Sequence, residues 1–278
     1  MIPSILIIGA TGNTGRAVAQ TLPTLLQSSS SLSGHRVIAL THSSSIIEQN
    51  WAEITVDWLR EHQVARAFIA SRIEPSQFAE ESTFYLNALN GGVNTGLSRR
   101  LTRVRQLAVD LPQPNVFSPL IMSPAVDFVK RFRETGKQDT LRLLLSKDAP
   151  VGIIDPDEIG VIAARLLSLD DTSAHNKAKY VLNEPEDITG MQIVAMVEQH
   201  IGTPVNDVSY KDVSFIDMVY EYKYTATKES KNVIYSIKRA PETAWEGKCS
   251  ASTASPEILK LAAPKRTPAD TLKALLEG

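Results

Sequence analysis

Three glycines at three-residue intervals, Gly9, Gly12 and Gly15, are the residues whose spacing says most about chemistry. They directly follow Ile5–Ile8, and four consecutive branched aliphatic residues are typical of a strand buried in a parallel sheet. Gly9 would let the chain turn sharply, Gly12 would let the backbone approach a pyrophosphate, and Gly15 would let the next helix pack closely. The N–H groups and positive dipole end of that helix would face the phosphates. The pattern predicts a dinucleotide-binding turn, with an ordinary strand-turn-helix as the alternative.

The composition fits an ordinary globular chain and excludes several other classes. Of 278 residues, 43% are hydrophobic and 22% are charged, which is enough apolar material for a sizeable core. The net charge of −2 favours neither a nucleic-acid-binding nor a membrane-binding surface. The single cysteine, Cys249, excludes an internal disulfide, and no histidine or cysteine spacing predicts a metal site. We expect no signal peptide and no membrane span, because no apolar run is long enough.

The elements around the glycines predict an α/β fold with a Rossmann-like parallel sheet. A helix should begin at about Thr14 and kink or end at Pro23. Further strands are expected at Val37–Leu40, Ile54–Val56 and Ala67–Ala70. A helix over Pro75–Asn90, with Phe78, Ser82, Tyr85 and Leu89 along one side, should stop at Gly91-Gly92.

The second half of the chain predicts a smaller C-terminal α/β lobe. The division expected is a nucleotide-binding core over residues 1–122 and an interleaved substrate or partner lobe over residues 123–278. The elements expected in this half are an extended segment Pro114–Met122, a helix Ser123–Glu134, strands Leu141–Leu145 and Val151–Ile154, a helix from Asp155 to Leu169, a strand Lys179–Asn183, a capped helix Ile193–Ile201, a strand Val205–Tyr210 and a terminal helix capped by Thr267–Asp270.

Five stretches together resemble one family, the NmrA-like atypical short-chain dehydrogenases/reductases, and fungal members in particular. The resemblance covers most of the chain, 1–278, except roughly Val93 to Leu111, and implies a Rossmann-like core that binds NADP or NAD. The stretches are Gly9–Gly15, Asp57-Trp58, Gln113–Pro119, Pro150–Gly160 and Leu182–Thr189.

The resemblance also implies which residues bind the cofactor. The glycine loop would hold the pyrophosphate, the segment after the second strand would lie near the adenosine ribose, and Asp57 with Trp58 would lie near the adenine. Residues after the fourth strand would lie along the cofactor, and a later segment would approach the nicotinamide. The full set is Gly9, Ala10, Thr11, Gly12, Asn13, Thr14, Gly15, His42, Ser43, Ser44, Asp57, Trp58, Ala70, Ser71, Asn115, Val116, Phe117 and Ser118.

Two departures from the family pattern affect the interpretation. His42 stands where NADP-preferring relatives commonly carry an arginine, yet no acid follows the second strand, which argues against strict NAD preference. We therefore favour NADP, with NAD as the alternative. Between Val93 and Pro112 neither the fifth strand nor a lysine or tyrosine of active relatives is recognisable. Four arginines there lie on a helical pattern, which favours a solvated face over a phosphate or nucleic-acid patch.

No catalytic residue is predicted. Tyr224 and Lys228 have the Tyr-x-x-x-Lys spacing of the superfamily, but they come far later in the chain than the expected position. Two functions remain open. The first is an NADP-dependent oxidoreductase that passes hydride to or from a small organic substrate, plausibly a secondary metabolite. The second is a non-catalytic dinucleotide-sensing regulator that acts through a protein partner such as a transcription factor. We expect a cytoplasmic protein, or a nuclear one if it is a regulator.

Overall fold

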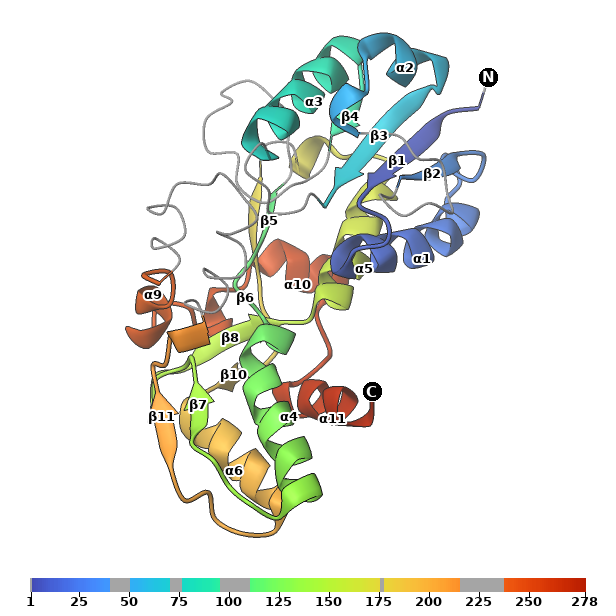
Figure 1. Ribbon diagram of the computed structural model, residues 1–278. Helices are drawn as coiled ribbons and strands as arrows, with labels where there is room; N and C mark the ends of the chain where they lie inside the picture. The colour runs from blue at the N-terminus through green and yellow to red at the C-terminus, as the bar shows by residue number, and fades with distance from the viewer. Residues whose placement is uncertain (1, 41–50, 71–76, 96–110, 176–177, 216–237) are drawn as a thin grey trace. The chain divides into compact units, whose positions relative to one another are not determined.

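The computed structural model divides the chain into two compact units (Figure 1). It describes residues 2–40, 51–70, 77–95, 111–175, 178–215 and 238–278. The first unit comprises Met1–Gln113, Pro156–Leu182 and Ser255–Ala263, and the second comprises Pro114–Asp155, Asn183–Ala254 and Pro264–Gly278. Both units are therefore built from three separate pieces of the sequence.

The first unit is built on a parallel sheet whose strand order is β2-β1-β3-β4. Its elements are β1 (Ser4–Ile8), α1 (Asn13–Ser28), β2 (Arg36–Leu40), a 3₁₀ turn (Trp51–Glu53), α2 (Val56–Glu61), β3 (Val64–Ile69), α3 (Gln77–Gly91), β4 (Asn94–Thr95), β5 (Leu111–Pro114, ending at the unit boundary), α5 (Pro156–Leu167), a 3₁₀ turn (Ser173–His175), β9 (Lys179–Leu182) and α10 (Pro256–Ala262). A separate pair of strands is formed by β5 and β9.

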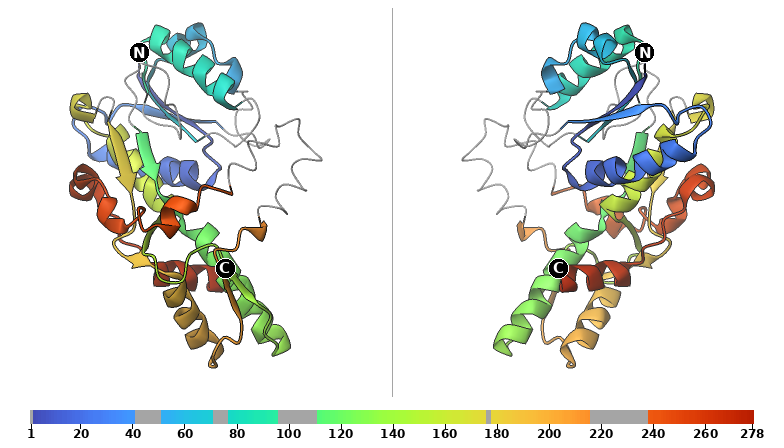
Figure 2. Two further views of the ribbon diagram at one scale, coloured as in Figure 1. Left: turned by 90° about the vertical axis from the view of Figure 1, so that its left-hand side faces the viewer. Right: turned by 90° about the vertical axis from the view of Figure 1, so that its right-hand side faces the viewer.

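Helices cover both faces of this sheet, as the alternating side chains of β1 require. Ile5 and Ile7 point into a core shared with α1 and α5, whereas Leu6 and Ile8 point into a core shared with α2 and α3. Figures 1 and 2 show α1 and α5 side by side, away from α2 and α3. All five residues of β1 are buried, as predicted from the continuous apolar run.

Several expectations for the first unit are wrong. Ile54–Val56 is not a strand, because Thr55 caps α2: its side-chain oxygen accepts a hydrogen bond from the Trp58 N–H at 3.2 Å. Of the kink or end expected at Pro23, the end is wrong, because helix α1 continues to Ser28. Leu89 is 48% exposed, and the buried face of α3 is instead formed by Glu81, Phe84, Tyr85 and Ala88.

The sheet position after α3 is occupied. Asn94 and Thr95 pair in parallel with Arg66 and Ala67 of β3, where the sequence showed no recognisable strand. This short strand extends the parallel sheet by one position. Residues 96–110, which include most of the predicted arginine-rich helix, lie outside the described residues.

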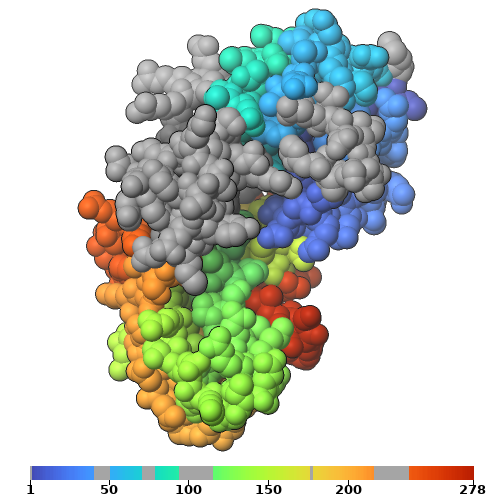
Figure 3. All heavy atoms as spheres, in the orientation of Figure 1, coloured from blue at the N-terminus to red at the C-terminus, as the bar shows by residue number. Residues whose placement is uncertain are grey.

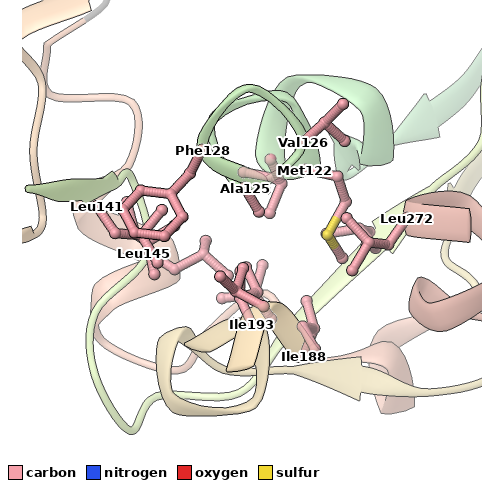
Figure 4. Close-up of a cluster of buried hydrophobic side chains, with 14 of the residues drawn as sticks. Met122, Ala125, Val126, Phe128, Leu141, Leu145, Ile188, Ile193 and Leu272 are labelled. Atoms are coloured by element: carbon pink, nitrogen blue, oxygen red, sulfur yellow. The ribbon is translucent and has the colours of Figure 1, made fainter. Parts of the chain in front are cut away.

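The second unit has its own core. Its elements are β6 (Val116–Phe117), α4 (Ser118–Thr135), β7 (Leu141–Leu143), β8 (Val151–Ile154), β10 (Asp187–Ile188), α6 (Gly190–Ile201), β11 (Val208–Tyr210), α9 (Glu242–Trp245), a 3₁₀ turn (Ala251–Thr253) and α11 (Pro268–Glu277). Strands β10, β8 and β6 form one sheet, and β11 pairs with β7 in parallel. Figure 4 shows Phe128, Ala125 and Met122 of α4 facing Ile193 of α6 and Leu272 of α11 across this core.

One expectation for the second unit is wrong, and two are confirmed. Helix α4 begins at Ser118, so the predicted extended segment is helical from that residue onward, with Pro119 in the first turn, where proline is tolerated. The predicted capping box of α6 is present, and so is the Thr267–Asp270 cap of α11. Within the described residues, no helix is both long and apolar enough to cross a bilayer.

Candidate functional site

The turn between β1 and α1 lies where the direction of strand order reverses. From β1 the chain passes to β2 on one side, and it later returns to β3 on the other side. Ligands of open α/β sheets bind at the carboxyl ends of the strands at such a point. Backbone hydrogen bonds hold the three strand ends together: Ala10 N–H donates to Leu40 O, and Ala70 N–H donates to Ile8 O, both at 3.0 Å.

Gly9 makes the sharp turn off the strand. Its φ is +78°, a left-handed conformation that strains any residue with a side chain. A Cβ atom at this position would also lie 2.2 Å from the carbonyl oxygen of Ala70. Gly9 therefore has a structural reason to be glycine whether or not a ligand binds.

Gly15 is a glycine for a second structural reason. A Cβ atom there would lie 2.1 Å from the Gly9 carbonyl oxygen and 3.2 Å from the Cα of Ala10. The first turn of α1 is thus packed directly on the backbone of the loop that precedes it.

Gly12 differs from both. It is exposed, its φ of −74° suits any residue, and a Cβ atom would come no closer than 3.3 Å to Gly9 O. A small side chain at residue 12 would therefore need only a slight adjustment of the loop, far less than at Gly9 or Gly15. A close approach by a ligand would explain why this residue has none.

The beginning of α1 is open. Gly12 is the N-cap residue and supplies no side-chain hydrogen bond, and the first turn contains no acid. The first N–H groups of a helix have no acceptor within the helix, and together with the helix dipole they attract anions. Thr11, Gly12 and Asn13 are exposed, and the α1 segment reaches the surface in Figure 3 (blue). This combination suits a phosphate group.

Helix α5 supports α1 from the side, which the sequence did not reveal. A Cβ atom at Gly160 would lie 2.5 Å from the Cβ of Ala17 and 2.6 Å from the carbonyl oxygen of Thr14. The first turns of the two helices are also joined by an Arg16–Asp157 ion pair at 3.4 Å. Only the contact in three dimensions shows that Gly160 touches the first turn of α1.

Asp57 does not follow a strand as expected. It lies in the first turn of α2, its side chain is 96% exposed, and it forms an ion pair with Arg60 at 3.8 Å. The ring of Trp58 stacks on His62, with the ring centroids 4.0 Å apart. The structure thus places both residues on a helix, and a contact of either with the adenine stays a prediction.

Several other predicted site residues lie outside the part of the chain that the structure describes, or next to its gaps. His42, Ser43, Ser44 and Ser71 lie outside the described residues, as do Tyr224 and Lys228. Leu40 is the last described residue before residues 41–50, and its carbonyl accepts a hydrogen bond from the glycine loop. Ala70 is the last described residue before residues 71–76.

The predicted nicotinamide-proximal segment belongs to the second unit. Val116 and Phe117 pair with Ile153 and Ile154 of β8. The Asn115 side-chain amide donates to the Cys249 carbonyl at 2.6 Å, so it fastens the 249–254 segment within this unit. Ser118 is fully buried, and its Oγ has no hydrogen-bond partner among the described residues.

The described residues contain no group of three or more His, Cys, Asp and Glu side chains placed to hold a metal ion. The exposed start of α1, which has no side-chain cap, suits recognition of an anion by backbone N–H groups.

Comparison with known proteins adds evidence about the fold. No protein-family model and no curated protein matches the sequence. An Escherichia coli NADPH-dependent quinone oxidoreductase, solved in complex with NADPH, is 15% identical over 99% of each chain, with a TM-score of 0.69. The Citrobacter sp. triphenylmethane reductase complexed with NADP(H) is 13% identical over 99% of this chain and 100% of that one, with a TM-score of 0.66.

The chain has the Rossmann-like fold of these proteins. The same fold is found in Nmra, a negative transcriptional regulator, which is 14% identical over 100% of this chain and 96% of that one, with a TM-score of 0.63. Nmra has also been solved in complex with NAD. The fold agrees with the resemblance to the NmrA-like family that the sequence motifs indicate.

Proposed function

We propose that this protein is an NADP(H)-dependent oxidoreductase of the NmrA-like type, acting on a small organic substrate. In this proposal the first unit binds the dinucleotide. The observation that carries the proposal is the uncapped beginning of α1 at the strand-order reversal. It is supported by the NADPH and NADP(H) complexes of two proteins that share the fold.

The residues of the turn fit a pyrophosphate. Gly12 leaves room for it, and the N–H groups at the start of α1 are available donors next to the positive helix dipole. Gly9 and Gly15 hold the turn in shape through backbone contacts. The turn therefore needs little rearrangement to receive an anion, which lowers the free-energy cost of binding.

The remaining contacts are proposed from the sequence resemblance. His42, Ser43 and Ser44 would meet the adenosine ribose and its 2′-phosphate, and Ala70 with Ser71 would lie along the cofactor. Asn115, Val116, Phe117 and Ser118 would serve the nicotinamide end. Among the described residues, the Ser118 hydroxyl has no hydrogen-bond partner, whereas the Asn115 amide donates one hydrogen bond to the Cys249 carbonyl.

When bound, the dinucleotide supplies or accepts the hydride, and the protein binds and orients it. No acid or base is assigned to a proton transfer. The E. coli relative in fold is a quinone oxidoreductase, so quinones are the first substrates to test.

A second function has its own support. Nmra, a negative transcriptional regulator, has the same fold, and the sequence shows no recognisable catalytic segment. A regulator would bind the dinucleotide without turnover and pass its redox state to a protein partner.

One series of measurements tests both functions. Calorimetric titration with NADPH, NADP⁺, NADH and NAD⁺ gives the dissociation constants, and NADPH oxidation is then followed with quinones, enones and triphenylmethane dyes. NADPH binding with turnover supports the enzyme. Binding of all four forms with no turnover supports the regulator. Absence of binding by every form contradicts both.

A further inference from the structure

We propose that Gly160 of α5 is a positioning residue for the phosphate-binding turn. Its missing side chain lets α5 pack so closely on α1 that the first turn of α1 is fixed where the pyrophosphate binds. This inference rests on the proposed function, because it assigns a role in dinucleotide binding. Gly160 belongs to the first unit, as does the turn itself.

Gly160 lies very close to α1. A Cβ atom at Gly160 would meet Ala17 Cβ at 2.5 Å, Thr14 O at 2.6 Å and Val18 N at 3.0 Å. Carbon atoms in contact prefer separations of about 3.5–4.0 Å, so the first of these gaps is about 1 Å too short. Two of the three contacts are backbone atoms, which cannot rotate away as a flexible side chain could.

Helix α1 is confined on its other side as well. Gly15 lies one residue after Thr14, and a Cβ atom on it would reach the Gly9 carbonyl oxygen at 2.1 Å. The first turn of α1 is therefore held between the glycine loop and α5. A displacement caused at Gly160 would be carried to the donors at the helix start, because close-packed interiors transmit strain.

Helix α5 is held in place at its far end and cannot easily move away from α1. At its C-terminal end, the buried guanidinium of Arg66 on β3 donates to the carbonyls of Leu167 and Leu169, both at 2.6 Å. Leu167 is the last residue of α5 and Leu169 lies two residues beyond it, so the arginine ties the end of the helix to the central sheet. Ala163, Ala164 and Leu167 of α5 are also buried in the core shared with α1.

The test is Gly160→Ala, with NADPH affinity measured by calorimetry. A shift of about 1 Å at a binding group can cost as much as 100-fold, and we expect the dissociation constant for NADPH to rise at least tenfold. Leu26→Ala is the matched control. Leu26 is buried in the same core but lies at the far end of α1, so its loss destabilises the fold without pushing on Thr14.

The outcomes separate the two proposals. NADPH binding by the unsubstituted chain tests the proposed function alone, and its absence would end both. If the unsubstituted chain binds and Leu26→Ala stays within threefold of it, a tenfold loss in Gly160→Ala supports the positioning role. A Gly160→Ala protein that binds within threefold of the unsubstituted chain overturns it and leaves the proposed function intact.

A second measurement uses the unsubstituted chain and does not depend on a variant that folds. Coupling between sites is reciprocal, so NADPH should slow hydrogen exchange in α5 around Gly160–Ala164 as well as in α1. Helix α6 of the second unit serves as the reference. Unchanged exchange in α5 at saturating NADPH would overturn the proposal.

Discussion

The beginnings of α1 and α6 solve the same physical problem in opposite ways. Both helices start with N–H groups that have no acceptor within the helix. At α6, Thr189 accepts a hydrogen bond from the Gln192 N–H at 3.2 Å, and the Gln192 side chain accepts one from the Thr189 N–H at 2.8 Å. At α1, Gly12 has no side chain with which to do this.

The start of α6 is satisfied by its own side chains, and α2 and α11 are capped in the same way, by Thr55 and Thr267. A missing side-chain cap is not peculiar to α1, because α4, α9 and α10 also lack one. The start of α1 is in addition exposed and lies at the strand-order reversal. If the comparison is right, changes at α1 should affect nucleotide binding, and changes at the capped starts should affect only stability.

The largest expected effect comes from Gly15→Ala, because the added Cβ would lie 2.1 Å from the Gly9 carbonyl oxygen. Overpacking against the backbone should lower the free energy of unfolding by about 3 kcal/mol and abolish NADPH binding. Urea denaturation and calorimetry measure the two effects. Gly34→Ala is the control, because its Cβ would meet no atom within 4 Å. Equal stability of the two variants would refute the close packing of the turn.

The next effect should come from Asp212 of the second unit, whose carboxylate accepts hydrogen bonds from Ser214 N–H at 2.9 Å and Arg142 at 2.8 Å. Burial raises the pKa of this carboxyl, but the hydrogen bonds from Ser214 and Arg142 outweigh burial and bring the pKa to about 2. Asp212→Asn should therefore lower the free energy of unfolding at pH 7 by ~1–2 kcal/mol.

The stability difference between Asp212→Asn and the unsubstituted chain should depend on pH. The folded-state pKa is below the unfolded one, so the contribution is complete above about pH 4 and disappears as the pH falls towards 2. Urea denaturation between pH 7 and pH 2.5 should show the two proteins converging at the acid end. A constant difference across this range would exclude the charged interaction as its cause.

A smaller effect is expected from Thr189→Ala, which removes the cap of α6. Loss of an N-cap side chain costs about 1 kcal/mol, measurable as a lower urea midpoint. NADPH affinity should not change, since this helix start already satisfies its own donors. A several-fold loss of NADPH affinity in this variant would remove the distinction between the two kinds of helix start.

The glycine turn could be predicted from the sequence because its determinants are local. The turn is marked by a short continuous stretch of four aliphatic residues, three glycines and a helical pattern. Strand β1 and helix α1 form where this stretch predicts them. The caps of α6 and α11 were predictable for the same reason. The strand predicted at Ile54–Val56 is wrong because these three residue types favour a strand. The N-cap role of Thr55 shows only in the hydrogen bond that it accepts from the Trp58 N–H, three residues later.

Other features depend on contacts between distant parts of the chain. The polar pair Asn94-Thr95 is a strand only because β3 lies beside it, so no local pattern reveals it. Gly160 has a role only because α5 packs on α1, and Asn115 donates to a carbonyl far along the sequence. The three loop glycines also differ only in three dimensions. Backbone atoms leave no room for a Cβ atom at Gly9 and Gly15, whereas the contact at Gly12 is looser.

Gly12→Asp is the substitution that tests whether the start of α1 binds the pyrophosphate of a dinucleotide. Aspartate at the N-cap would supply the missing acceptor, and its Cβ would make a tight contact with Gly9 O at 3.3 Å, for which the loop must yield by a few tenths of an ångström. Gly12→Ala adds the same Cβ without an acceptor and is the matched control.

Calorimetric titration with NADPH, together with urea denaturation, gives the decisive result. We predict that Gly12→Asp leaves the free energy of unfolding within about 1 kcal/mol of the unsubstituted value, because the new cap offsets the tight Cβ contact, and weakens NADPH binding at least 100-fold, more than Gly12→Ala does. A folded Gly12→Asp protein that binds NADPH as tightly as the unsubstituted chain would contradict the account.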